Sequence, residues 1–213
     1  TGWNLLCPCS QGLVKRYGQH KGRIVFPLWT SGTAYSVIAF RAGYIYSDDN
    51  GSTWHLGEFA DFSTANEVQC AEDLNGDMLF SIRLESANPP KILARHSDLT
   101  KKYTMLQTNK PLTSAIVMSG LIQGENKYDK TANKFQLTAC RTMSRQELLI
   151  HTSYDGGENW RTYLLPSTIG TAVAYSCIEN ISASKKFLMW EADGAVNFKY
   201  SVVALSNLVN EVQ

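Results

Sequence analysis

Residues 47–54 read SDDNGSTW and residues 153–160 read SYDGGENW, so the pattern S-x-D-x-G-x-x-W occurs twice in one chain. A short apolar run precedes each copy, at 44–46 and 148–151, and a further strand-like stretch follows each. Asp and Asn favour turns because their side chains hydrogen-bond the backbone, and Gly accepts a positive φ. The pattern therefore predicts a hairpin turn that belongs to a repeated supersecondary unit.

Turn chemistry explains every fixed position of both copies. We interpret these residues as structural and not catalytic: Ser47, Asp49, Gly51 and Trp54 in the first copy, and Ser153, Asp155, Gly157 and Trp160 in the second. The Trp of each copy begins the next strand and can pack back under the turn.

The composition excludes several classes of protein. The 213 residues include 20 basic and 19 acidic side chains, a net charge of +1 that gives no electrostatic case for nucleic acid or an anionic membrane. No apolar run approaches the length of a membrane span, and the first residues lack the features of a signal peptide. The five cysteines have irregular spacing, which indicates buried thiols with room for one disulfide rather than a disulfide framework or a zinc site.

Strand-like runs dominate the chain, and helical periodicity is almost absent. Short runs between Gly, Asn, Asp and Ser turns predict an all-β sandwich, barrel or propeller. The expected strands are 22–29, 35–40, 43–47, 67–72, 78–83, 92–96, 116–122, 135–140, 147–152, 172–177, 187–191 and 198–204.

The order of these strands favours a β-propeller of four-stranded antiparallel blades. Residues 96–103, HSDLTKKY, form a degenerate third copy of the turn about midway between the other two, so the spacing is that of one blade. We expect blades at 16–60, 67–107, 115–165 and 172–205, with three clear strands in the last. Residues 1–18 are expected to form a loop between blades.

The repeated turn is similar to the Asp box of the sialidase (neuraminidase) superfamily. A resemblance to its bacterial and animal exo-sialidases runs through nearly the whole chain, and is carried by GRIVFPLW at 22–29, NEVQCAE at 66–72, DMLFSIR at 77–83, SRQELLI at 144–150 and AYSCI at 174–178. That family has a six-bladed propeller. The resemblance therefore implies that residues 1–213 are the C-terminal portion of one propeller domain, with about four of its blades.

The resemblance assigns four site residues. Tyr175 takes the position of the nucleophile, and Glu67 that of the glutamate that assists it. Arg83 and Arg145 take the positions of two members of an arginine triad that binds the substrate, with Arg141 as the competitor of Arg145. Glu72 is interpreted as structural, because strand alternation places it on the face opposite Glu67.

This set of residues suits sialic acid, which carries a carboxylate on its anomeric carbon. Guanidinium groups bind a carboxylate in a bidentate manner. A carboxylate nucleophile would meet a like charge there, whereas a Tyr hydroxyl does not, and sialidases are the Tyr exception among glycosidases. A phenol with a pKa of about 10 needs a base within reach, here Glu67. The resemblance implies a retaining exo-sialidase that forms a covalent glycosyl-tyrosine.

Two parts of the family's site have no counterpart in this sequence: the first triad arginine and the acid/base aspartate. We therefore expect the chain alone to be inactive or very weak, and to need N-terminal blades from a missing segment or a second chain. The resemblance further implies sialylated glycans or glycolipids as substrates, no cofactor and no metal, and a secreted or cell-surface location.

Two other interpretations stay open. A non-catalytic sialic-acid-binding propeller would share the Asp boxes, although a pure lectin needs no Tyr–Glu pair. A trans-sialidase would use a sugar hydroxyl in place of water, and the sequence does not separate transfer from hydrolysis.

Overall fold

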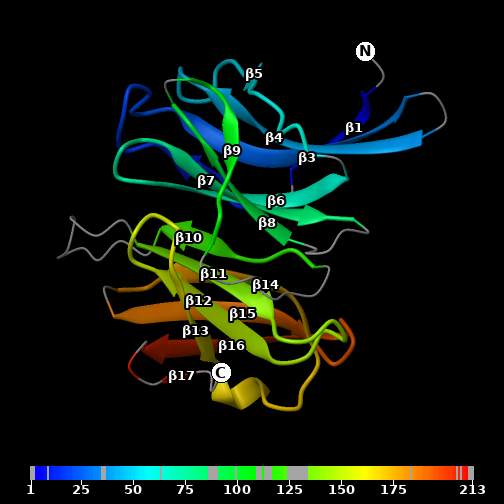
Figure 1. Cartoon of the computed structure of the whole chain (residues 1–213), viewed down its shortest axis with the longest axis vertical. Coiled ribbons are helices and arrows are strands. Elements are labelled where there is room, and N and C mark those ends of the chain that lie inside the picture. The colour runs from blue at the N-terminus through cyan, green and yellow to red at the C-terminus, as the bar shows by residue number, and fades with distance from the viewer. Residues whose placement is uncertain are drawn as a thin grey trace. The chain divides into compact units, whose positions relative to one another are not determined.

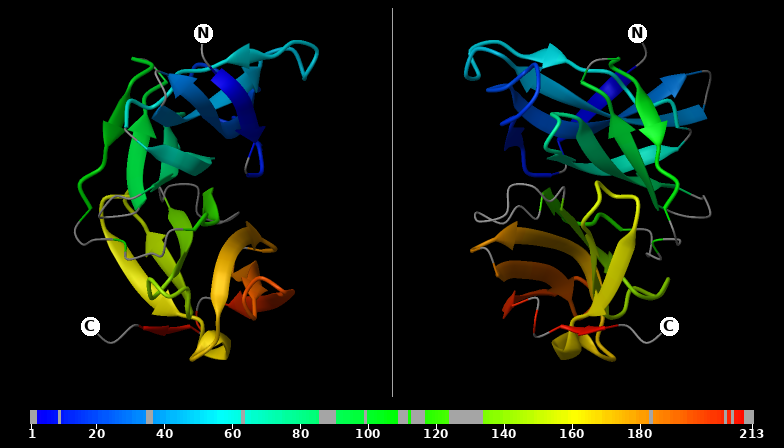
Figure 2. Two further views of the ribbon diagram at one scale, coloured as in Figure 1. Left: turned by 90° about the vertical axis from the view of Figure 1, so that its right-hand side faces the viewer. Right: turned by 60° about the vertical axis from the view of Figure 1, so that its left-hand side comes forward.

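The computed structural model describes the whole chain except residues 1–2, 9, 35–36, 63, 86–90, 99, 109–111, 113–116, 124–133, 183, 205, 207 and 211–213. Cys9 and Leu99 lie outside the described residues. The chain divides into two compact units, Thr1–Leu106 and Gln107–Gln213. Figures 1 and 2 show that each unit is a pair of twisted antiparallel sheets.

The first unit contains two sheets with a shared core. One sheet has the order β1-β3-β4-β5 with β2 also paired to β3, and consists of β1 (Trp3–Pro8), β2 (Leu13–Val14), β3 (Ile24–Ala34), β4 (Val37–Ser47) and β5 (His55–Leu56). The other has the order β6 (Ala65–Glu72), β7 (Met78–Leu84), β8 (Lys91–His96) and β9 (Tyr103–Met105). Alternate side chains of both sheets, among them Val25, Tyr44, Val68 and Phe80, are buried together between them.

The second unit repeats this arrangement. Its first sheet has the order β10 (Leu121–Gln123), β11 (Phe135–Cys140), β12 (Leu148–Ser153), β13 (Trp160–Leu164) and β17 (Val209–Asn210), and a short 3-10 helix, η1 (Pro166–Thr168), follows β13. Its second sheet consists of β14 (Val173–Asn180), β15 (Lys185–Ala192) and β16 (Asn197–Ala204). Leu148, Ile178, Leu188 and Trp190 belong to the core between the two sheets. The structure is thus all-β, and its antiparallel sheets are propeller blades, as expected.

Two local expectations are wrong. Residues 1–18 are not a loop throughout, because β1 pairs antiparallel with β3 and β2 pairs with the start of β3. Residues 35–40 and 43–47 do not form two strands, because β4 continues through Arg41-Ala42-Gly43 in unbroken register with β3. Gly43 is not a turn residue: a Cβ there would lie 2.6 Å from the Phe59 ring, so the glycine allows close packing inside a strand.

Each Asp box connects two neighbouring strands through a self-contained network of hydrogen bonds. Ser47 Oγ donates to Asp49 Oδ1 over 2.8 Å, and Ser153 Oγ donates to Asp155 Oδ1 over the same distance. The residue before each Trp then donates both its backbone N–H and its side chain to that Asp. Asn159 therefore serves the second box as Thr53 serves the first, which explains why this position tolerates either residue.

The third copy occupies the same place in its blade but is connected differently. His96 pairs with Tyr103 across β8 and β9, as Ser153 pairs with Trp160 in the second box. Asp98 does not close the turn. Its Oδ1 instead accepts a hydrogen bond of 2.7 Å from the buried ammonium of Lys15, which also donates to Gly76 O. In this copy the acidic side chain links separate segments of the unit.

Candidate functional site

Glu67 lies in a β-bulge near the start of β6. Ala65 pairs with Leu84 and Val68 with Ile82, so that two residues of β6, Asn66 and Glu67, face the single residue Arg83 of β7. A bulge interrupts the alternation of side chains and redirects the extra one. The separation of 16 positions between Glu67 and Arg83 thus becomes a direct contact across two strands.

The first unit brings these two predicted site residues together. Arg83 Nη1 donates to Glu67 Oε2 over 2.6 Å, and both side chains are mostly buried. Glu72, on the same strand, accepts hydrogen bonds from the backbone N–H groups of Arg16 and Tyr17. Burial raises the pKa of Glu72 although these N–H groups oppose the shift. The contacts of Glu72 are structural, as the sequence predicts.

Glu85, which binds Arg83, and Asn66, which binds Glu85, are absent from the set predicted by sequence. Arg83 Nη2 donates to Glu85 Oε1 over 2.7 Å, and Asn66 Nδ2 donates to the same oxygen over 2.7 Å. Arg83 is therefore held between two carboxylates, and charge-assisted hydrogen bonds of this length are strong. Glu85 sits two positions beyond Arg83 on the same face of an extended segment, which is the signal that could have identified it.

Tyr175 lies in a matching bulge of the second unit. Val173 pairs with Ala192 and Ser176 with Trp190, so that Ala174 and Tyr175 face the single residue Glu191 of β15. In the register of their strands Tyr175 corresponds to Glu67, and Glu191 corresponds to Arg83. Glu191 is not among the predicted site residues, because a bulge cannot be recognised from period-2 alternation.

The strand that carries Tyr175 is tightly held against its neighbours. A Cβ on Gly120 would lie 2.7 Å from Ile178 N and 2.8 Å from Cys177 Cα, so only glycine allows this approach to β14. Ser176 Oγ donates to Thr138 Oγ1 over 2.8 Å, and Gly120 N donates to the same oxygen over 2.7 Å. These contacts fix the backbone directly after the bulge.

Arg145 lies next to the start of β14. Its carbonyl accepts a hydrogen bond of 2.8 Å from Val173 N, two residues before Tyr175, and its φ of 59° places it in a turn. Its competitor Arg141 forms an ion pair of 3.0 Å with Glu147, whose other carboxylate oxygen accepts Gly170 N. The Arg141 side chain is thus engaged within the turn. In the second unit the backbone of Arg145 thus lies beside Val173, two positions before Tyr175 in the chain.

The described residues give no indication of a metal centre or a membrane span. Among them no group of three His, Cys, Asp or Glu side chains is placed to hold a metal ion. No described helix is long and apolar enough to cross a membrane. Of the cysteines that the structure describes, Cys70 and Cys140 are buried, and Cys7 and Cys177 are partly exposed.

The fold and the turns define a β-propeller protein with Asp boxes. Comparison with known proteins shows which propeller proteins the chain resembles. No family model matches the chain. A sialidase from Bacteroides fragilis (strain YCH46) is 27% identical over 206 residues, which cover 93% of this chain and 36% of that protein. A Hadza microbial sialidase has a similar structure, with a TM-score of 0.78 and 22% identity over 98% of this chain and 39% of its own.

The intramolecular trans-sialidase of Ruminococcus gnavus also has this fold, with a TM-score of 0.72 and 20% identity over 99% of this chain and 46% of its own. The chain thus spans less than half the length of each of these relatives. The chain is thus similar in sequence to bacterial sialidases over part of their length, and it shares the fold of part of the propeller of sialidases of known structure.

Proposed function

We propose that this chain is part of a retaining exo-sialidase that removes terminal α-linked sialic acid from glycoconjugates. The matched bulges of β6 and β14 carry this proposal. Glu67 and Tyr175, which we propose as the base and the nucleophile, occupy corresponding positions in these two bulges. Bulges are enriched next to active sites, where they redirect a side chain.

In this mechanism Tyr175 Oη attacks the anomeric carbon while Glu67 takes its proton. The C–O bond to the leaving sugar breaks, its oxygen takes a proton from the acid/base group that the rest of the protein would supply, and a glycosyl-tyrosine forms. Water then gives a proton back to that group and attacks the same carbon. The phenolate of Tyr175 leaves and regains the proton from Glu67, and sialic acid is released with retained configuration. A Tyr nucleophile, unlike the carboxylate nucleophile of most retaining glycosidases, brings no second negative charge next to the substrate carboxylate.

Arg83 and Arg145 bind that carboxylate in the proposal. The ion pair between Arg83 and Glu67 supports this assignment for Arg83, because one guanidinium can hold the base and still present further N–H groups. Arg145 is preferred to Arg141 because its carbonyl accepts the N–H of Val173, two residues before Tyr175. The remaining triad arginine and the acid/base aspartate would come from residues outside this chain.

An exposed apolar surface supports the proposal that further blades cover the second unit. Phe198, Tyr200 and Val202 point to one face of β16 and are 70%, 72% and 52% exposed. Met189 and Phe187 of β15 pair with Tyr200 and Val202 and extend this face. Exposed apolar patches of this kind mark interaction sites, and the apolar face of another blade is the partner that we propose.

Trapping of the covalent intermediate tests the proposed function. The complete protein is incubated with a fluorinated sialosyl fluoride, whose leaving group needs no acid and whose ring fluorine slows hydrolysis of the adduct. We expect a stoichiometric increase in mass on the peptide that contains Tyr175. A label on another residue, or the absence of any adduct in an active preparation, would contradict the mechanism.

A second measurement separates the alternative functions. Proton NMR of the reaction with a sialoside should show the α-anomer of free sialic acid first, as retention requires. A product with the sialyl group on a sugar hydroxyl would indicate a trans-sialidase, and binding without turnover would indicate a lectin. We expect a homogeneous preparation of the 213-residue chain alone to show little or no turnover, and full activity of that preparation would refute the need for further blades.

A further inference from the structure

The bulge that carries Tyr175 is held from the facing sheet by two side chains of β11. Cys140 and Thr138 lie two positions apart on this strand and therefore point to the same face, where both contact β14. Both residues are fully buried. Cys140 contacts β14 before Tyr175 and Thr138 contacts it after Tyr175. Neither is among the predicted site residues.

Cys140 holds the backbone before Tyr175. Its Sγ donates to Val173 O over 3.1 Å and to Ala174 O over 3.4 Å, so that one proton is shared between two carbonyls. A bulge takes the extra residue out of the regular ladder of the sheet, and its backbone groups then need other partners. Ala174 is one of the two residues in the bulge. The thiol is therefore placed where the strand departs from regular pairing.

The hairpin that contains Cys140 also holds the amide of Val173. Val173 N donates to Arg145 O over 2.8 Å. Residues 141–147 connect β11 to β12, so Cys140 is the last strand residue before the turn in which Arg145 lies. One hairpin thus binds Val173 twice, through its N–H and through its carbonyl, and so fixes the start of β14 relative to the backbone of Arg145.

Thr138 holds the backbone after Tyr175. Its Oγ1 accepts Ser176 Oγ over 2.8 Å and Gly120 N over 2.7 Å. Ser176 is buried and directly follows Tyr175 in the chain. Tyr175 therefore stands between two residues that are each bound to β11.

The corresponding strand of the first unit, β3, has different residues at these two positions. The first residue of each Asp box fixes the correspondence, because it pairs with position 24 of β3 in the first unit and with position 135 of β11 in the second. Thr138 and Cys140 thus correspond to Pro27 and Trp29, which have neither a hydroxyl nor a thiol. The two contacts are not a requirement of every blade.

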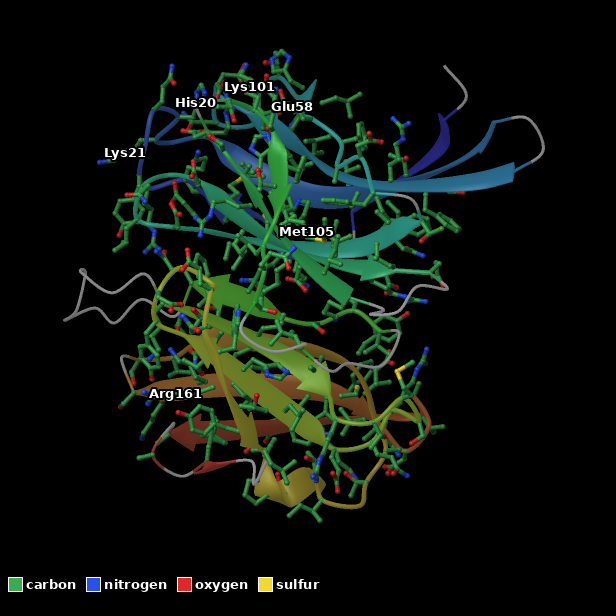
Figure 3. The ribbon with its side chains drawn as sticks, viewed as in Figure 1. His20, Lys21, Glu58, Lys101, Met105 and Arg161 are labelled. Atoms are coloured by element: carbon green, nitrogen blue, oxygen red, sulfur yellow. The ribbon has the colours of Figure 1, made fainter. Side chains whose placement is uncertain are left out.

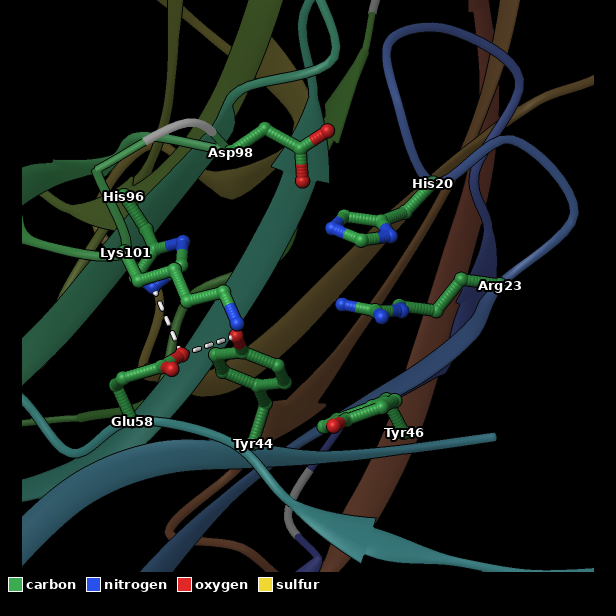
Figure 4. A pocket seen from close by; sticks show the side chains of 8 residues that line it. All are labelled: His20, Arg23, Tyr44, Tyr46, Glu58, His96, Asp98 and Lys101. Carbon is green, nitrogen blue, oxygen red and sulfur yellow. Dashed lines mark hydrogen bonds and ion pairs between the residues drawn. The ribbon is translucent and has the colours of Figure 1, made fainter. Parts of the chain in front are cut away.

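A polar cluster of the first unit lies away from the bulge of that unit. Glu58 accepts the Tyr44 hydroxyl over 2.6 Å and lies 3.2 Å from His96 Nε2, as Figure 4 shows. In Figure 3 the labelled side chains of Glu58 and His20 lie at the same end of this unit. Arg83 pairs with the first residue of β8, whereas His96 is the last residue of that strand, about 16 Å further along. This cluster therefore holds the opposite end of the blade.

We propose that Cys140 and Thr138 are positioning residues for Tyr175, an inference that rests on the proposed function of Tyr175 as the nucleophile. They act through the backbone of β14 and do not contact the substrate. The phenol oxygen lies at the far end of a long side chain, so a small rotation of the backbone in the bulge displaces it. A displacement of about 1 Å at a reacting group can lower the rate about 10²-fold.

Hydrogen exchange of the 213-residue chain tests the contact of Cys140 independently of activity. Cys140→Ala removes the donor, whereas Cys140→Ser keeps an O–H donor in a side chain of similar size. We expect amide exchange in the peptide that contains residues 173–176 to be about fivefold faster in Cys140→Ala and nearly unchanged in Cys140→Ser. Cys70→Ala, in the buried core of the first unit, is the control and should leave this peptide unchanged. Unchanged exchange in Cys140→Ala would overturn the proposal.

Kinetics of the complete protein test the effect on the reaction. Cys140→Ala should lower kcat about tenfold or more with KM nearly unchanged, because the proposed substrate-binding arginines stay in place. Cys140→Ser should recover most of this loss, and Cys70→Ala should keep the kcat of the unmodified protein. A full kcat in Cys140→Ala, or an equal loss in Cys70→Ala, would refute the positioning role.

Thr138 offers a second matched pair of variants. Thr138→Val keeps the shape of the side chain but removes the acceptor of Ser176 Oγ and Gly120 N, and should lower kcat in the same way as Cys140→Ala. Thr138→Ser keeps the hydroxyl and should retain kcat. Equal values of kcat in the two variants would overturn the role of this hydroxyl.

Tyr175→Phe distinguishes failure of this inference from failure of the proposed function. If Tyr175→Phe is inactive and Cys140→Ala is fully active, the positioning role is wrong and the proposed function stands. If Tyr175→Phe keeps full turnover, Tyr175 is not the nucleophile, and both the proposed function and the positioning role are overturned.

Discussion

The two units of this chain have the same backbone plan but carry different side chains on it. Each contains a bulged first strand, β6 or β14, and each contains an Asp box. At the bulge the first unit presents the ion pair of Glu67 and Arg83, whereas the second presents Tyr175 opposite Glu191. At the box the first unit leaves Trp54 43% exposed, whereas Trp160 of the second is 2% exposed.

The two units therefore share the backbone features of the fold and differ in the side chains of the candidate site. The bulge and the turn are backbone features: the bulge occurs in the sheets that begin with β6 and β14, and the Asp box occurs in the other two sheets. The residues at the bulge are free to differ, since their side chains leave the regular alternation of the strand. A repeated scaffold can therefore place a base in one blade and a nucleophile in another.

Loss of the Tyr175 hydroxyl should have the largest effect on activity. In the complete protein, Tyr175→Phe should lower turnover of an aryl sialoside by about 10³-fold or more, because the nucleophilic oxygen is gone. Binding of sialic acid should remain. Tyr200→Phe, in the same unit and 72% exposed, is the control and should retain full activity. Undiminished turnover by Tyr175→Phe would rule out this residue as the nucleophile.

The corresponding change in the first unit should have the next largest effect. Glu67→Gln should lower turnover about 10²–10⁴-fold, as removal of a general base does. Glu85→Gln leaves the base intact and weakens only one contact of Arg83, so it should lower turnover about tenfold, mainly through KM. Equal losses in the two variants would show that Glu67 only positions Arg83.

The two Asp boxes should differ in their contribution to stability. Trp160→Ala removes a buried side chain whose Nε1 donates to Gly157 O over 2.7 Å, and should cost about 3–5 kcal/mol. Trp54→Ala removes a half-exposed ring and should cost about 1 kcal/mol or less. Urea unfolding of both variants measures the two values. A large loss for Trp54 would mean that its ring is covered in the complete protein.

Acid should lower the stability that both Asp boxes contribute, and we expect this effect to be smaller than those of the substitutions above. Hydrogen bonds from Thr53 and Ser47 lower the pKa of Asp49 to about 2, and those from Asn159 and Ser153 lower that of Asp155 against the effect of burial. A lowered folded-state pKa contributes stability above the unfolded value of about 3.9, and that stability is lost as the pH falls through the folded value. The temperature at the midpoint of thermal unfolding should therefore decrease as the pH is lowered from about 4 to about 2.

Substitution of Asp49 provides the check on this assignment. Asp49→Asn cannot ionise, so the variant should be less stable at neutral pH and less sensitive to acid than the unmodified chain. An unchanged slope of the unfolding midpoint against pH would assign the acid sensitivity to other carboxylates, such as Asp98, whose pKa the ammonium of Lys15 lowers against the effect of burial.

Much of the fold follows from local sequence. The turn residues of the Asp boxes depend on contacts between near neighbours in the chain, so their pattern predicts the hairpins. The stretch from Arg41 to Gly43 resembles a turn, because its residues are small or polar, until its partner β3 is known. The strand β1 could not be predicted from local sequence either, because it depends on pairing with residues 28–32, which lie further along the chain.

The candidate site divides in the same way. The sequence by itself identified Glu67, Arg83, Arg145 and Tyr175 as candidate site residues, because they lie within short recognisable motifs. Only the tertiary structure revealed the two bulges, the place of Glu85 beside Arg83, and the contacts of Thr138 and Cys140 with β14. The physical reason is that a motif reports interactions between near neighbours, whereas a bulge or a contact between two sheets depends on strand register and packing between segments far apart in the chain.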